Sequence, residues 1–298
     1  MLVNLRDICA IAEQNNMAVG AFNAPSLEAV RAVIDAAEET GYPVILQHAE
    51  VHENIVPLDV MGPTMVALAE RSSAQICVHL DHGENLSYLH RALEYGFTGV
   101  MFDGSTLPYE DNVYYSARAA EMCSGYDCGL ECELGSMGAR EGDVLTEDGA
   151  EAQAGGSGAV YTDPDQASDF VSETGLDILA CSFGTVHGLY RGKPHLSFDV
   201  LKAIRDRVRI PLVMHGGSGV SDEDYRQAID AGIRKINYYT YGAKYAGEAA
   251  CEVADAVRAN GAGSPVYWHD LTSAAYDRLV KDFIDVMKVF ANGAKPVA

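Results

Sequence analysis

The chain has 298 residues, of which 21 are basic and 43 are acidic, giving a net charge of −22. It shows no basic stripe, which argues against nucleic acid as a partner, and no apolar run approaches the ~18 residues of a membrane span. The N-terminal residues lack the apolar core of a signal peptide, and the seven cysteines include no CxxC pair. We therefore expect a cytoplasmic protein with reduced thiols and no membrane partner.

Eight short apolar or β-branched runs alternate along the chain with amphipathic stretches of helical spacing. The predicted strands are 18–23, 43–49, 76–82, 99–105, 128–135, 178–184, 211–217 and 235–240. The clearest helical stretches, most of them opening at a Ser, Asn or Asp cap and ending at Gly, are 27–40, 85–96, 163–175 and 221–232. This alternation predicts an α/β fold, a (β/α)8 TIM barrel formed by residues 1–298 as one domain. An open doubly wound sheet is the alternative.

One segment interrupts the alternation. Residues 136–160 are polar and rich in Gly and Ala, and they are long for a connection between a strand and a helix. They begin directly after the fifth predicted strand, on the face where barrel active sites lie. This position favours a mobile active-site loop over a surface insertion.

Three histidines follow predicted strands. His82 ends ICVHLDH, His187 follows ILACSFG, and His215 follows PLVM. A single histidine is most often an ordinary core or surface residue. Three at the carboxyl ends of barrel strands, however, would meet at one mouth and form an open site for zinc, with a coordination position left for substrate.

Carboxylates accompany these histidines. Asp81 is adjacent to His82 and could hold a substrate hydroxyl and exchange its proton; its alternative role is to orient a metal ligand. Asp103 and Glu133 also end strands. They could be alternative metal ligands or hydrogen-bond partners of the ligands, and both interpretations stay open.

Glycine-rich turns indicate where an anion would bind. HGGSG (215–219) precedes a predicted helix, and GTVHG (184–188) follows the sixth strand. Exposed backbone N–H groups at such turns bind phosphate, which suits a protein with few cations. HGGSG also lies between the seventh and eighth strands, where phosphate sites of barrels cluster.

HLDHG, the GTVHG histidine, HGGSG and KINxxT occur in an order and spacing that resemble the class II metal-dependent ketose-phosphate aldolases, the family of fructose-bisphosphate and tagatose-bisphosphate aldolases. The resemblance covers nearly the whole chain, including ECELG and the Gly-rich segment after it. It implies a lyase that splits a sugar phosphate into dihydroxyacetone phosphate and an aldehyde.

The resemblance also implies roles for single residues. Zinc (Zn2+) would be bound by His82, His187 and His215, and Asp81 would move the proton of the C4 hydroxyl. Asp103 and Glu133 match a second metal position, and Glu141 matches a loop glutamate that exchanges a proton at C3. The residues that match the family's phosphate-binding positions, often with Na+ or K+ beside the phosphate, are Gly188, Gly216, Gly217, Ser218, Asn237 and Thr240. The resemblance further implies a homodimer or homotetramer.

Two rival interpretations of the chain are disfavoured. A Schiff-base aldolase needs a reactive lysine, but the sixth strand has none, and Lys235 opens the eighth strand, which predicts a place at the opposite end of the barrel. A non-catalytic relative would be expected to lose ligands or the acid, whereas this chain keeps all of them.

The chain departs from the family mainly around the aldehyde half of the substrate. Val266 stands where an arginine usually holds the distal phosphate, and Ala49 replaces a serine near the aldehyde. We therefore expect, as an alternative to a bisphosphate aldolase, a ketose 1-phosphate aldolase with a non-phosphorylated aldehyde product. Three arginines could restore a distal anion site: Arg140, Arg258 and Arg278.

Overall fold

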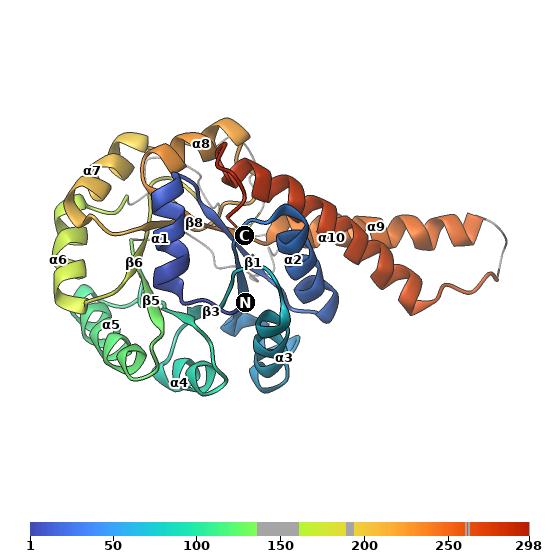
Figure 1. Cartoon of the computed structure of the whole chain (residues 1–298), viewed down its shortest axis with the longest axis horizontal. Coiled ribbons are helices and arrows are strands. Elements are labelled where there is room, and N and C mark those ends of the chain that lie inside the picture. Colours follow the sequence, from blue (N-terminus) through green and yellow to red (C-terminus); the bar gives the residue numbers. More distant parts are fainter. Residues whose placement is uncertain (136–160, 189–193, 260, 262, 298) are drawn as a thin grey trace.

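The computed structural model describes residues 1–135, 161–188, 194–259, 261 and 263–297. At its centre lies a closed barrel of parallel strands in chain order, in which β1 pairs with both β2 and β8 (Figure 1). The strands are β1 (Val19–Asn23), β2 (Val44–Ala49), β3 (Ile76–Gly83), β4 (Gly99–Phe102), β5 (Gly129–Leu134), β6 (Ile178–Cys181), β7 (Leu212–Met214) and β8 (Ile233–Tyr238). The predicted TIM barrel is confirmed, and the doubly wound alternative is wrong.

Helices surround the barrel, and their caps explain where they begin. The described helices are α1 (Leu5–Asn15), α2 (Leu27–Thr40), the 3-10 helix η1 (Glu50–Asn54), α3 (Leu58–Arg71), α4 (Leu86–Glu94), α5 (Tyr109–Ser124), α6 (Pro164–Thr174), α7 (Phe198–Val208), α8 (Asp222–Asp230), α9 (Thr240–Ala259) and α10 (Trp268–Phe290). The side chains of Ser26, Asn85, Asp163 and Ser221 accept hydrogen bonds from N–H groups in the first turns of α2, α4, α6 and α8. These are the caps that the sequence predicts.

Several strands end earlier than their apolar runs suggest. The predicted strands 99–105, 178–184 and 211–217 leave the ladder at Phe102, Cys181 and Met214. The residues beyond these points turn, and Gly184 and Gly216 have φ values of 119° and 62°, which favour glycine. The trailing parts of the runs therefore form the mouth of the barrel instead of extending its wall.

The opposite end of the barrel is closed by α1, which lies across it (Figure 1). An apolar cluster joins this helix to strand side chains of the barrel. The helix contributes Leu5, Ile8, Cys9 and Ala12, and the strands contribute Ala21, Ile45, Cys77, Ala180 and Val213. Burying this apolar surface stabilises the closed end. The polar residues of the interior are consequently concentrated towards the other end, where the strands finish.

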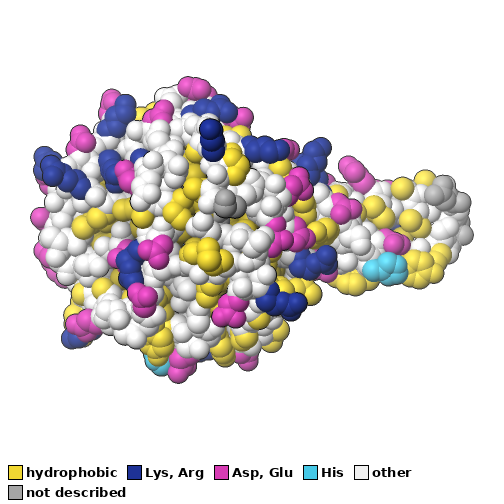
Figure 2. Space-filling view, in the orientation of Figure 1, with side chains coloured by type: hydrophobic (Ala, Val, Ile, Leu, Met, Phe, Trp, Pro, Cys, Tyr) yellow, Lys and Arg dark blue, Asp and Glu magenta, His cyan; other side chains and the backbone are white. Residues whose placement is uncertain are grey.

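The last two long helices form an arm. α9 and α10 lie side by side, and their far ends project beyond the barrel (Figure 1). On the face seen in Figure 2, hydrophobic side chains gather along this arm, and Trp268 at the start of α10 is 76% exposed.

Helices able to cross a bilayer are absent from the part of the chain that the structure describes.

Candidate metal centre and active site

The end of β3 departs from regular strand geometry where it presents two of the predicted site residues. Neighbouring residues of a strand face opposite sides, so a regular strand could not bring both Asp81 and His82 into the barrel. The pairing of β3 with β4 shifts register between Leu80 and Gly83, and His82 has a φ of 45°. This bulge changes the direction of the backbone, so that the side chains of both Asp81 and His82 are buried at the mouth of the barrel.

His82, His187 and His215 come together as the sequence predicts. Their nitrogen atoms lie within 4.8 Å of one another, and all three side chains are buried. His82 Nε2 is 3.0 Å from His215 Nδ1, and the His187 ring centroid is 5.0 Å and 5.6 Å from those of His82 and His215. Three converging imidazoles match the donor set of a catalytic zinc site.

Carboxylates fix which nitrogen of two of these histidines faces the others. A carboxylate only accepts hydrogen bonds, so the Nδ1–H of His82 donates to Asp103 Oδ2 (2.8 Å) and the Nε2–H of His215 donates to Glu131 Oε1 (2.7 Å). The two remaining nitrogens, His82 Nε2 and His215 Nδ1, therefore face each other at 3.0 Å with one proton between them, because Asp81 and Asp103 outweigh burial and raise the pKa of His82 to about 10. A metal ion bound by both nitrogens would replace that proton. Such outer partners orient metal ligands and make them more basic, so the residues present fit a bound metal ion.

Below His215 lies a fully buried ion pair. Lys235 Nζ is 2.9 Å from Glu131 Oε2, and His79 Nε2 is 3.3 Å from the same oxygen. Burial alone would raise the pKa of Glu131, but Lys235 and the hydrogen bond from His215 lower it well below its usual value. The expectation that Lys235 lies at the opposite end of the barrel is wrong, because its ammonium group extends along the interior to the base of the site.

The same lysine acts on Asp81 through an amide. Lys235 Nζ donates to Asn237 Oδ1 (2.6 Å), and Asn237 Nδ2 donates to Asp81 Oδ1 (3.0 Å). Asn23 Nδ2 donates to the other oxygen, Asp81 Oδ2 (2.8 Å). Burial disfavours the carboxylate, but His82, His215 and these donors outweigh it and hold the pKa of Asp81 below its ordinary value. Asp81 is thus an oriented carboxylate beside the three histidines.

A second group of possible metal ligands shares His82. It comprises His82, Asp103 and Glu133, all buried and with ligand atoms within 4.8 Å of one another. Burial and the nearby Asp103 raise the pKa of Glu133 well above its usual value, whereas the hydrogen bonds from His82 and Ser105 overcome burial and lower the pKa of Asp103 to about 2. Within the described residues, Glu133 Oε2 has no hydrogen-bond partner. Asp103 thus accepts the hydrogen bond from His82 and also belongs to this group of possible ligands, so both predicted roles stay predictions.

The predicted phosphate-binding residues surround the end of β7 and β8. A Cβ on Gly217 would lie 2.7 Å from the backbone oxygen of Asn237, so glycine is required for this close approach. Ser218 Oγ accepts a hydrogen bond from the Tyr239 N–H (3.1 Å), and Thr240 is the first residue of α9. Gly188, seven residues after the end of β6, has a φ of 90°. Glu141 and Arg140, like the whole predicted loop 136–160, lie outside the described residues.

Sequence reasoning missed the functional contacts of Asn23, Glu131 and Lys235. A signal existed for the last two, because a charged residue inside an otherwise apolar barrel strand must find a partner when it is buried. Asn23, the last residue of the run AFN, carried the weaker signal of a polar side chain at a strand's carboxyl end.

A closed parallel barrel with three converging histidines and an oriented carboxylate at the ends of its strands defines a metal-dependent barrel enzyme. The family model described as "Fructose-bisphosphate aldolase class-II" matches residues 3–292. The chain belongs to this family, and its reaction class is that of a carbon–carbon lyase.

Individual relatives agree with this assignment. Over 240 residues the chain is 35% identical to Escherichia coli "Uncharacterized protein YdjI" (80% of this chain, 83% of the relative). Over 245 residues it is 34% identical to the fructose-bisphosphate aldolase of Staphylococcus epidermidis (80% of this chain, 81% of the relative). A crystal structure of the YdjI aldolase from E. coli K12 superimposes with a TM-score of 0.83 at 30% identity, covering 99% of this chain and 98% of the other.

Proposed function

We propose that this protein is a zinc-dependent aldolase that cleaves a ketose phosphate between C3 and C4, yielding dihydroxyacetone phosphate and an aldehyde. The observation that carries the proposal is the pairing of three converging histidine nitrogens with Asp81, whose two carboxylate oxygens are held by Asn23 and Asn237. Zinc bound by the histidines supplies a Lewis acid that stabilises the negative charge developing next to the ketose carbonyl.

Asp81 acts as the base for cleavage. It accepts the proton of the C4 hydroxyl as the C3–C4 bond breaks; C4 becomes the aldehyde carbon, and the electron pair of the bond goes to C3. The hydrogen bonds from Asn23 and Asn237 hold Asp81 in its ionised form and orient it as a proton acceptor. C3 then takes up a proton, a step for which the family resemblance nominates Glu141.

The phosphate at C1 is the group that anchors the substrate. We assign it to the backbone and side-chain donors of Gly188, Gly216, Gly217, Ser218, Asn237 and Thr240, with Na+ or K+ as its counterion. Two features support this assignment: the N-terminus of α9, which begins at Thr240, is a favourable position for an anion, and Gly217 packs closely against Asn237.

We further propose that the substrate has no second phosphate. Val266 replaces the arginine expected for a distal phosphate, and two of the candidate substitutes are engaged elsewhere. Arg258 lies 3.3 Å from the exposed Asp255, and the guanidinium of Arg278 lies 4.4 Å from the centroid of the Tyr245 ring. The second candidate function is cleavage of a ketose bisphosphate, the activity named for the family and for the S. epidermidis relative.

We also propose a homodimer or homotetramer. The projecting arm of α9 and α10 supports this, since Tyr267 and Trp268 are more than half exposed on it. Light scattering coupled to size exclusion measures the mass, and a monomer of 31.9 kDa at micromolar concentration contradicts the proposal.

The function is tested by measuring release of dihydroxyacetone phosphate from fructose 1,6-bisphosphate, tagatose 1,6-bisphosphate and the matching ketose 1-phosphates, with and without a chelator. Chelator-sensitive release that favours the 1-phosphates is the expected result. Equal or faster release from a bisphosphate keeps the aldolase and refutes the single phosphate. Release that a chelator leaves unchanged refutes the zinc mechanism.

A further inference from the structure

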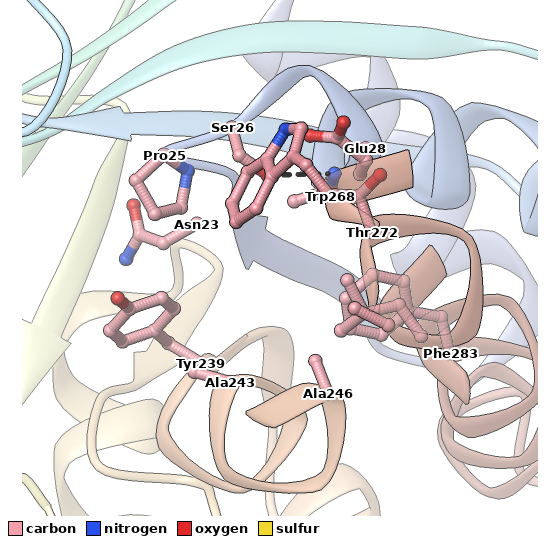
Figure 3. Close-up of a pocket in the computed structure, with 13 residues that line it drawn as sticks. Asn23, Pro25, Ser26, Glu28, Tyr239, Ala243, Ala246, Trp268, Thr272 and Phe283 are labelled. Atoms are coloured by element: carbon pink, nitrogen blue, oxygen red, sulfur yellow. Dashed lines mark hydrogen bonds between the residues drawn. The ribbon is translucent and has the colours of Figure 1, made fainter. Parts of the chain in front are cut away.

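An apolar pocket of about 240 Å3 lies beside the mouth of the barrel, between the end of β1 and the helices α9 and α10 (Figure 3). Asn23, Pro25 and Tyr239 line one side, and Thr272 and Phe283 line the opposite side. The volume corresponds to the share of roughly eight water molecules in the liquid. This is space for a chain of several carbon atoms.

The pocket adjoins the reacting centre through a shared residue. Asn23 lines the pocket and also donates to Asp81 Oδ2 (2.8 Å), the carboxylate proposed to act at the C4 hydroxyl. Tyr239, on the same side, packs against the buried His52 with ring centroids 5.0 Å apart. The pocket is thus one side chain away from Asp81, within reach of the remaining carbons of a molecule whose C4 lies at this carboxylate.

The lining favours uncharged, apolar groups. Ala246, Leu279 and Phe283 contribute hydrocarbon walls, and the Trp268 indole also lines the pocket (Figure 3). None of the described lining residues is Lys or Arg, and Glu28 is the one that carries a charge. A phosphate there would be desolvated without a cation and would face a carboxylate.

We infer that this pocket is the subsite for the aldehyde half of the substrate and that it selects an uncharged aldehyde with an apolar segment of three or more carbons, such as a deoxygenated or aliphatic chain. This inference rests on the proposed aldolase function. Because each buried methylene group contributes a favourable transfer energy, kcat/KM should increase roughly threefold to fourfold per methylene until the pocket is full.

The first test is the synthetic direction of the reaction. Zinc-loaded enzyme is given dihydroxyacetone phosphate with acetaldehyde, propanal, butanal or pentanal, and with glyceraldehyde or glyceraldehyde 3-phosphate. We expect kcat/KM to rise along the aliphatic series and the phosphorylated aldehyde to be at least tenfold poorer than glyceraldehyde. A flat series, or preference for glyceraldehyde 3-phosphate, overturns the inference while leaving the aldolase intact.

Substitutions locate the effect. Ala246→Phe places a ring in the pocket and should lower kcat/KM for pentanal at least tenfold while changing that for acetaldehyde less than twofold. Ala256→Phe, at an exposed position of the same helix outside the pocket, is the matched control and should change neither. Thr272→Arg adds a cation to the lining and should improve glyceraldehyde 3-phosphate relative to glyceraldehyde. Equal loss for both aliphatic aldehydes in Ala246→Phe counts against the pocket.

A binding measurement separates the pocket from the chemistry. Trp268 is the chain's single tryptophan, and its indole borders the pocket. Unreactive 1-pentanol should therefore produce a saturable blue shift of tryptophan emission that Ala246→Phe abolishes and Ala256→Phe retains. Absence of the shift in the wild-type protein refutes the pocket. A shift together with no aldol product from any aldehyde refutes the proposed function and, with it, the assignment of the pocket to an aldehyde.

Discussion

The buried charge of Lys235 offers the sharpest test of how the base of the site is held together. Lys235→Met keeps an unbranched side chain one atom shorter but leaves Glu131 without the cation that lies 2.9 Å away, at a position where both side chains are inaccessible to solvent. Removing one partner of a buried pair costs about 3–5 kcal/mol. Glu131 keeps its contacts with His79 and His215, so we expect the lower end, about 3 kcal/mol of lost unfolding free energy.

The double variant Glu131→Gln/Lys235→Met removes both charges and should recover most of this loss. The assay is urea unfolding followed by far-UV circular dichroism, with chelator in every sample so that metal binding does not contribute. Lys202→Met, at an exposed position of α7, is the matched control and should lie within about 0.5 kcal/mol of wild type. A double variant no more stable than Lys235→Met would refute the claim that an uncompensated Glu131 causes the loss.

Three further perturbations test separate parts of the site and scaffold. Asp103→Ala removes the acceptor of the His82 Nδ1–H and should weaken zinc binding about 10–100-fold, measured by competition with a chromogenic chelator; unchanged affinity would mean that Asp103 does not orient His82. Asp81→Asn should retain one zinc per chain by elemental analysis yet lower turnover about 10²–10⁴-fold, and near-normal turnover would remove Asp81 from the mechanism. Burial lowers the pKa of His48 from 6.5 to about 4, so its contribution to stability is complete above pH 6.5 and is lost as the pH falls towards 4. Between pH 7 and pH 4 the wild type should lose about 3 kcal/mol more than His48→Gln, and parallel urea-unfolding curves would contradict this.

The order of strands and helices could be predicted because local signals repeat along the chain. Apolar runs mark the strands, and Ser26, Asn85, Asp163 and Ser221 mark the starts of helices. The ends of the strands were harder to predict, because an apolar run does not show where the strand stops and the loop at the barrel mouth begins. The run 211–217, for example, pairs with its neighbours only as far as Met214.

Within the site, the three histidines could be predicted because each lies at or after the carboxyl end of a strand, and parallel strands finish on the same face. The environment of Lys235 could not, because its partner Glu131 lies on a strand far away in the sequence, and the pattern of one strand says nothing of side chains across the barrel. The bulge at His82 could also have been predicted from the sequence. Asp81 and His82 are adjacent, and two adjacent residues can enter the same interior only where strand alternation is broken.

That break has a consequence for how the site tolerates motion and mutation. Most of its members stand on different strands, so their separations depend on packing and change when the wall of the barrel shifts. Asp81 and His82 are instead joined by one peptide bond, with Cα atoms about 3.8 Å apart. The proposed proton carrier and the metal ligand therefore move as one piece: a disturbance of the barrel can carry the pair away from His187 and His215, but it cannot part the two from each other.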